Sequence, residues 1–313
     1  MVRETTMENK KIVCFNERLG DRIIVKYFAE NVKTEFPEFE LYAFQSFKYP
    51  SVKGFDMELW APDLFAGFLY PEDGYRSCLD AENKTGYRVL YPTWGNLFVY
   101  APNMIRKTGR YPTLEIPDRY KQWLDTEFDE MVWRHYCRFA VGPPAGIVVW
   151  HILTDAPYSR SRNHNFKHHA AAIKMLARKY PDWLFIRIGR MDAENGLLRG
   201  DFKNIIDLTQ YDLTPSRSIS VISRGDIYVG GDTGMTHAAS ALKKKIVAIW
   251  GDITHMLRDR STRNNIQPGD WNSGPYVPEE DCYILRRNGG EHIMRPIYTA
   301  EEIVNGVEHF IKR

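Results

Sequence analysis

The residues best suited to chemistry lie in the stretch RGDIYVGGDTGMTHAASALKKKIVAIWGDI, residues 224–253. An apolar run at 227–229 is typical of a buried parallel strand, and two glycines end it. A short Ala-rich helix is expected over 236–242 and a second strand over 246–250. In such a unit, free N–H groups and the helix dipole form an anion site, most often for phosphate. From spacing alone, a purely structural role for this turn is as well supported as phosphate binding, because doubly wound proteins have several such turns.

The residue types in this turn indicate more than their spacing. Asp232 and Thr233 stand where a helix N-cap is expected, and Gly234 lets a ligand approach the backbone. The run DTGMTH at 232–237, followed by two alanines and by IVAIWG at 246–251, closely resembles the C-terminal signature of glycosyltransferase family 9. This is the heptosyltransferase-like family with the GT-B fold.

The resemblance implies an α/β GT-B fold, in which two Rossmann-like domains face each other across a cleft. It also implies that the turn holds the diphosphate of a nucleotide-sugar donor, which is a co-substrate and not a bound cofactor. The donor-binding residues expected in this turn are Asp232, Thr233, Gly234, Met235, Thr236 and His237. For His237, direct phosphate contact and bracing of the turn are both open.

Composition limits the class of protein. The chain has 313 residues, enough for two domains, with 43% hydrophobic and 26% charged residues. No run approaches the ~20 apolar residues of a membrane span, and the polar N-terminus does not resemble a secretory signal. Four scattered cysteines indicate a reduced, cytoplasmic protein. A net charge of +2 does not by itself indicate nucleic-acid binding.

The chain opens with a predicted β-α-β unit, with strands at 11–15 and 39–44 and a helix at 22–34. The Gly20-Asp21 pair between the first strand and the helix resembles the family's opening loop. The resemblance implies that Asp21 is the general base, with Arg18 and Gly20 on the acceptor side. The alternative is that Asp21 only caps its helix.

Residues 46–117 are rich in aromatic residues, proline and glycine and show little periodicity. Aromatic residues such as Trp60 and Phe65 could line an acceptor site, but filling of the N-terminal core is the stronger interpretation. This region differs most from the family, so the acceptor is the least transferable inference.

A long amphipathic helix is expected over 118–140, and the proline- and glycine-rich run at 142–146 is typical of a linker. The expected domains are therefore residues 1–145 and 146–313. The closing helix at 299–312 is expected to pack back on the N-terminal domain, as such helices do in the GT-B fold.

The second domain begins with a strand at 147–152, and the basic loop YSRSRNHNFKHH follows at 158–169. The family's corresponding loop supplies a cation to the donor phosphates, so Arg160 and Arg162 are the best candidates. A solvated basic loop is the alternative. Nearby histidines have no carboxylate or cysteine partner at ligand spacing, and the sequence contains no Asp-x-Asp triplet, so we expect no metal site.

A further strand is expected at 183–188, with Gly189 and Asp192 behind it. A carboxylate after a strand end can bind a ribose hydroxyl, which makes Gly189 and Asp192 donor-side candidates, with Glu194 an alternative. Ordinary surface charge would explain the same residues. The long basic loop at 255–274 follows the phosphate turn and is expected to border the cleft.

The sequence thus predicts a glycosyltransferase that moves a sugar from a nucleotide-diphosphate donor to an acceptor hydroxyl. The resemblance favours a lipopolysaccharide or other surface-glycan acceptor, with peripheral membrane contact possible. A modified DNA base is an alternative acceptor; a non-catalytic nucleotide-sugar-binding homologue and a nucleotide-sugar epimerase are alternative functions. The base and sugar of the donor, the acceptor, the anomeric outcome and the oligomeric state stay open.

Overall fold

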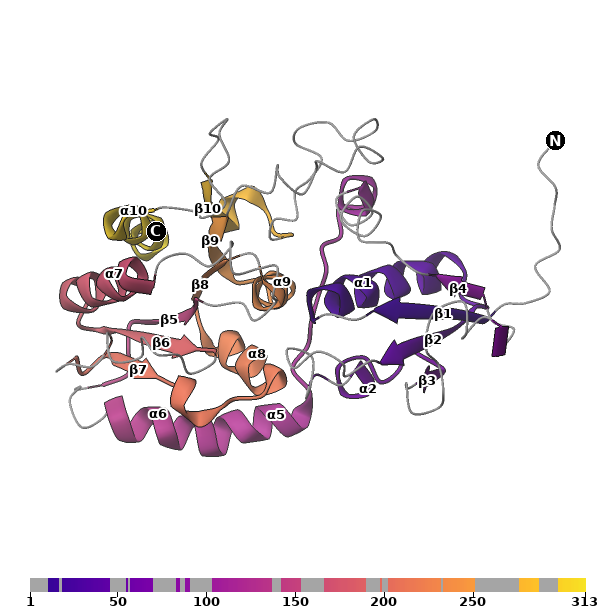
Figure 1. Ribbon diagram of the computed structural model, residues 1–313, viewed down its shortest axis with the longest axis horizontal. Coiled ribbons are helices and arrows are strands. Elements are labelled where there is room, and N and C mark those ends of the chain that lie inside the picture. The colour runs from indigo at the N-terminus through magenta and orange to yellow at the C-terminus, as the bar shows by residue number, and fades with distance from the viewer. Residues whose placement is uncertain are drawn as a thin grey trace. The chain divides into compact units, whose positions relative to one another are not determined.

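The computed structural model describes residues 11–16, 19–45, 55, 57–69, 83–84, 88–90, 103–136, 142–152, 166–189, 198, 202–231, 233–250, 276–286 and 298–313. The chain divides into a first unit, Met1–Arg110, and a second unit, Tyr111–Arg313. Each unit contains a parallel sheet with helices (Figure 1). The α/β class predicted from the sequence is confirmed.

The first unit has four parallel strands in the order β3-β2-β1-β4. Its elements are β1 (Lys11–Asn16), α1 (Leu19–Glu35), β2 (Glu40–Gln45), α2 (Met57–Trp60), β3 (Gly67–Leu69) and β4 (Arg88–Leu90). From β1 the chain first moves outward through β2 and β3, and β4 then adds on the other side of β1. The carboxyl end of β1 is therefore a topological switch point, the usual place for ligands in such sheets.

The core of the first unit lies around α1 and β2. Ile24 of α1 and Leu41 of β2 are fully buried, as helical and strand spacing require. Trp60 is buried as well, and its ring stacks on Phe55 at a centroid distance of 5.1 Å. Trp60 and Phe65 therefore fill the core, which confirms the stronger interpretation of those aromatic residues.

The second unit has six parallel strands in the order β10-β9-β8-β5-β6-β7. The strands are β5 (Gly146–His151), β6 (Trp183–Ile188), β7 (Ile205–Asp207), β8 (Ile227–Gly231), β9 (Lys245–Trp250) and β10 (Cys282–Arg286). The helices are α5 (Asp118–Trp123), η3 (Leu124–Phe128), α6 (Asp129–Tyr136), α7 (Phe166–Lys179), η6 (Thr209–Tyr211), α8 (Pro215–Arg224), α9 (Gly234–Ala241), η8 (Glu279–Asp281) and α10 (Ala300–Ile311).

Helices cover both faces of the second sheet, which explains why its central strands are almost entirely apolar (Figure 1). Residues of α7 and α10 pack with Val148, Phe185 and Val229 on one face. Residues of α5, α6, α8 and α9 pack with the alternate strand positions, among them Val149 and Tyr228, on the other. Tyr228 therefore points toward the layer that contains α9.

The closing helix α10 lies in the core of the second unit. A capping box at Thr299 and Glu302 begins it, as both reciprocal hydrogen bonds are present. Its fully buried residues Ile303 and Val307 belong to the cluster shared with α7. The apolar face of this helix packs against α7 and the second sheet, and its expected packing on the N-terminal domain stays a prediction.

The expected boundary near residue 145 differs from the observed division after Arg110. The helix from α5 to α6 buries Trp123 and Phe128 under the second sheet. The segment before it joins the same unit, since the Leu114 N–H donates to the Ala241 carbonyl of α9 at 2.9 Å. The run at 142–146 is a connection inside the second unit, because a helix that covers a sheet face belongs to that sheet's core.

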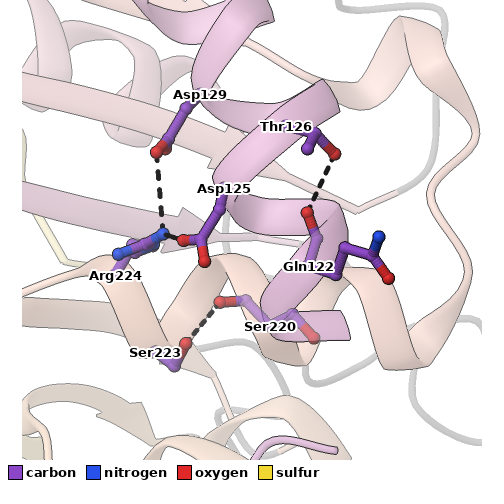
Figure 2. A network of polar contacts seen from close by, with 7 residues as sticks. All are labelled: Gln122, Asp125, Thr126, Asp129, Ser220, Ser223 and Arg224. Atoms are coloured by element: carbon purple, nitrogen blue, oxygen red, sulfur yellow. Dashed lines mark hydrogen bonds and ion pairs between the residues drawn. The ribbon is translucent and has the colours of Figure 1, made fainter. Parts of the chain in front are cut away.

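Polar contacts also join this helix to α8 (Figure 2). Arg224 of α8 pairs with Asp125 and lies 3.6 Å from Asp129. At the other end of α8, the Arg217 guanidinium lies 5.0 Å from the centroid of the Trp123 ring. The predicted single α-helix contains a π-helical turn, η3, around Asp125. These half-exposed pairs add to the apolar burial beneath them and contribute little by themselves.

We predict that a fragment of residues 111–313 unfolds in one cooperative transition, whereas a fragment of residues 146–313 does not fold. The shorter fragment loses the helix that covers one sheet face, and each large side chain removed is worth ~1.5–3 kcal/mol of burial. Thermal melting followed by circular dichroism tests this. Equal melting temperatures for the two fragments would contradict the assignment of the helix to the second core.

Candidate functional site

The carboxyl edge of the second sheet has its switch point between β5 and β8. From β5 the chain runs through β6 and β7 to one side, and β8, β9 and β10 then extend the sheet on the other. The register places His151, the last residue of β5, beside Gly230 of β8 and Ile188 of β6. Ligands of open α/β sheets bind at such an edge, so the turn that follows β8 is well placed for one.

The turn from β8 into α9 presents backbone donors. Thr233 is the N-cap of α9, with extended backbone, and its side chain accepts no hydrogen bond from the helix. Its carbonyl accepts from the N–H groups of Thr236, at 3.1 Å, and of His237, at 3.4 Å. Within the described part of the chain, the N–H groups of Gly234 and Met235 have no acceptor. Donors in this position, together with the helix dipole, favour an anion.

The side chain of Thr236 is fully buried. Its hydroxyl donates to the carbonyl of Gly231 and lies 3.3 Å from the hydroxyl of Tyr228. Burial raises the pKa of Tyr228 above its ordinary value, and the hydroxyls of Thr236 and Thr233 oppose this only in part. Thr236 was expected to bind donor, but its side chain braces the turn from inside.

His237 is also buried, and its ring stacks on Tyr276 with centroids 5.8 Å apart and planes inclined by 26°. This contact favours the bracing role that the sequence left open for His237. Tyr276 is buried as well, so the stacked pair is shielded from solvent.

Gly189 lies directly after β6, with a φ of +115°, in the region that favours glycine. A Cβ atom added there would lie 3.2 Å from a ring carbon of His151. The structure therefore brings Gly189 and the buried His151 together at the edge that also carries the β8–α9 turn.

Asp21 occupies the first turn of α1, next to Gly20 and close behind the carboxyl end of β1. Both predicted residues thus lie at the switch point of the first sheet. A carboxylate in the first turn suits the helix dipole. The neighbouring Arg22 is fully buried and donates to the Phe55 carbonyl at 2.6 Å, which fixes this end of α1.

Several predicted residues lie outside the described part of the chain. These are Arg18, Arg160, Arg162, Asp192 and Asp232. Among the described residues, no group of three His, Cys, Asp or Glu side chains is placed to hold a metal ion. No helix in the described ranges is long and apolar enough to cross a membrane.

Comparisons with known proteins agree with the family resemblance. The family model for glycosyltransferase family 9 (heptosyltransferase) matches residues 213–267, which contain the β8–α9 turn. No curated protein sequence matches the chain. The family predicted from residues 232–237 is thus supported by the segment that contains them.

Solved structures extend the likeness to the whole chain. E. coli ADP-heptose LPS heptosyltransferase II matches with a TM-score of 0.62 and 12% identity, over 96% of this chain and 99% of that one. A glycosyltransferase family 9 protein from Veillonella parvula matches with a TM-score of 0.61 and 13% identity, over 97% and 98%. E. coli heptosyltransferase WaaC with ADP matches with a TM-score of 0.51 and 13% identity, over 96% and 99%.

The predicted GT-B fold is confirmed by these structures. The chain therefore shares its fold with heptosyltransferases, and its segment 213–267 is similar to the sequence of glycosyltransferase family 9. The alternatives of a DNA-base acceptor and of a non-catalytic homologue gain no support from the matches.

Sequence reasoning did not predict the packing of four residues that shape this site, namely His151, Tyr228, Gly230 and Tyr276. Strand alternation gave a signal for one pair, because Tyr228 and Gly230 are two residues apart and share a face. A glycine two residues after a tyrosine leaves space for the ring. No local pattern connects Tyr276 with His237, since they are distant in sequence.

We predict that Gly230→Ala destabilises the protein and Gly231→Ala does not. A Cβ at Gly230 would lie 2.4 Å from the Tyr228 hydroxyl oxygen, and the tyrosine is fully buried. Such overpacking costs ~1–3 kcal/mol. A Cβ at Gly231 would lie 3.5 Å from the Ile249 carbonyl oxygen, an ordinary contact. Thermal melting of both variants is the measurement, and equal melting temperatures would contradict the close packing at Gly230.

Proposed function

We propose that this protein transfers a sugar from an adenosine-diphosphate sugar, without a metal ion, to a hydroxyl of a lipopolysaccharide or other surface glycan. The observation that carries the proposal is the β8–α9 turn. There, a family 9 sequence stands at the switch point with two backbone N–H donors that have no acceptor in the described chain. The scattered cysteines fit action in the reducing cytoplasm.

Adenine is proposed because the solved relatives point to it. One is named an ADP-heptose heptosyltransferase, and another was solved with ADP. In this chain, the diphosphate would lie against the N–H groups of Gly234 and Met235. Asp232, two residues before Gly234, completes the family signature.

The remaining donor contacts are assigned to two loops. Arg160 and Arg162 would neutralise the diphosphate, because a guanidinium can bind phosphate oxygens with two parallel hydrogen bonds. Asp192 would accept hydrogen bonds from the ribose, beyond the backbone of Gly189. This last role is supported by the position of Gly189 at the carboxyl edge of β6, next to His151.

Asp21 is proposed as the general base, with Gly20 and Arg18 on the acceptor side. Its carboxylate would take the proton of the acceptor hydroxyl while the acceptor oxygen forms a bond to the anomeric carbon. The bond from that carbon to the phosphate oxygen breaks, and the electron pair leaves with the diphosphate. By analogy with glycoside hydrolysis, the sugar passes through an oxocarbenium-like transition state. The helix N-terminus and a cation stabilise the charge on the leaving group.

We predict that ADP raises the melting temperature of the wild-type protein and that Gly234→Val abolishes this effect. A ligand at ~100 times its dissociation constant adds ~2.7 kcal/mol to stability. A valine side chain at the start of α9 would stand where the phosphates approach the backbone. A thermal-shift titration with ADP measures both effects, with the melting temperature of ligand-free Gly234→Val as the control for folding. Unchanged ADP binding by a folded Gly234→Val protein would remove the turn from the site.

We predict that Asp21→Asn lowers turnover at least a hundredfold, because general base catalysis typically contributes ~10²–10⁴-fold. Asparagine is similar in size but cannot take a proton. The melting temperature should fall only slightly, since a charge in the first helical turn is worth ~0.3–1 kcal/mol. ADP affinity, measured by calorimetry, should stay that of the wild type. Turnover within a few-fold of wild type would reduce Asp21 to a structural role in α1.

A further inference from the structure

We propose that Tyr228 and Thr236 are positioning residues that set the geometry of the phosphate turn by a chain of buried hydroxyl groups. The inference rests on the proposed function, because it assigns these two side chains to the same diphosphate site. Neither side chain is exposed to a ligand, since both are fully buried. They act through the backbone that they hold.

The direction of the hydrogen bonds follows from the number of protons. Thr236 has one hydroxyl proton, which it donates to the carbonyl of Gly231. The proton in the contact with Tyr228, at 3.3 Å, must therefore come from the tyrosine. Burial raises the pKa of Tyr228, so its hydroxyl keeps the proton that this donation needs. The chain runs from Tyr228 to Thr236 to Gly231.

This chain connects the two ends of the turn. Gly231 is the last residue of β8, and Thr236 lies in the first turn of α9. The bond between them closes a loop around residues 232–235, which include the N–H donors of Gly234 and Met235. The distance between strand end and helix start, and hence the direction of those donors, depends on the Thr236 hydroxyl. A fixed direction matters because donors aimed in advance at a developing charge need no reorganisation.

Tyr228 in turn is held by its surroundings. The space beside its ring is available only because residue 230 has no side chain, as a Cβ there would meet two ring carbons at 2.7 Å. One buried phenol thus supports the first turn of α9.

The test compares Thr236→Val, Thr236→Ser and Tyr228→Phe with Ser240→Ala. Valine has the shape of threonine without the hydroxyl, and serine restores the hydroxyl. Ser240 is the matched control, because it is a buried hydroxyl on the same helix with no partner in the described chain. ADP affinity is measured by calorimetry, and kcat and KM for the transfer reaction with ADP-heptose are determined in parallel.

We expect Thr236→Val to weaken ADP binding ~10-fold, within the range for loss of a buried hydrogen bond. Tyr228→Phe should weaken it less, ~3-fold, because its contact is long. Thr236→Ser and Ser240→Ala should bind ADP within twofold of wild type. For Thr236→Val, kcat should fall by a larger factor than KM rises, since the leaving diphosphate gains charge in the transition state.

The outcomes separate this inference from the proposed function. If the wild-type protein fails to bind ADP, the proposed donor site is wrong and the inference falls with it. If the wild type binds ADP and both Thr236→Val and Tyr228→Phe bind it equally well, only the inference is overturned. It is also overturned if Ser240→Ala loses as much as Thr236→Val, or if Thr236→Ser fails to restore binding. If Thr236→Val does not fold, the ADP affinities of Tyr228→Phe and Ser240→Ala are compared instead. Equal affinities of these two variants overturn the inference.

Discussion

The burial of the Tyr228 ring beneath a residue without a side chain is the contact on which the site depends. Gly230 leaves the space, Tyr228 fills it, and the phenol reaches the hydroxyl of Thr236. A strand that ends in two glycines would otherwise have little to fix its direction, because glycine has the largest backbone freedom. Here a fully buried aromatic ring supplies the rigidity.

The same edge of the sheet unites residues that are far apart in the chain. Parallel strands all end on one side, so His151, Gly189 and the β8–α9 turn meet there although they come from separate β-α units. The buried His151 fills the gap between neighbouring strand ends, against Gly189. His237 of α9 stacks on the buried Tyr276. The proposed anion site thus depends on the sheet edge and its layers, of which the family 9 segment is one part.

The second unit begins well before its first strand, because one of the helices that cover its sheet precedes the sheet in the chain. A six-stranded sheet with apolar residues on both faces needs helices on both sides. Helices α7 and α10 cover one face. The other face is covered by α8 and α9 together with the helix of residues 118–136. Apolar burial by Trp123 and Phe128 therefore draws the chain from residue 111 onward into this unit, and Arg224 aligns the helix on α8.

The sequence by itself determined the α/β class, the β8-α9-β9 unit and the resemblance to family 9, because local apolar runs, glycines and the residues at 232–237 are visible without any contact over distance. It also placed Gly20 and Asp21 behind the first strand. Only the tertiary structure decided that Thr236 faces inward, that Tyr276 stacks on His237, and that the division of the chain falls after Arg110. Each of these depends on which face of an element meets which neighbour. Packing between distant segments decides that, and local periodicity does not record it.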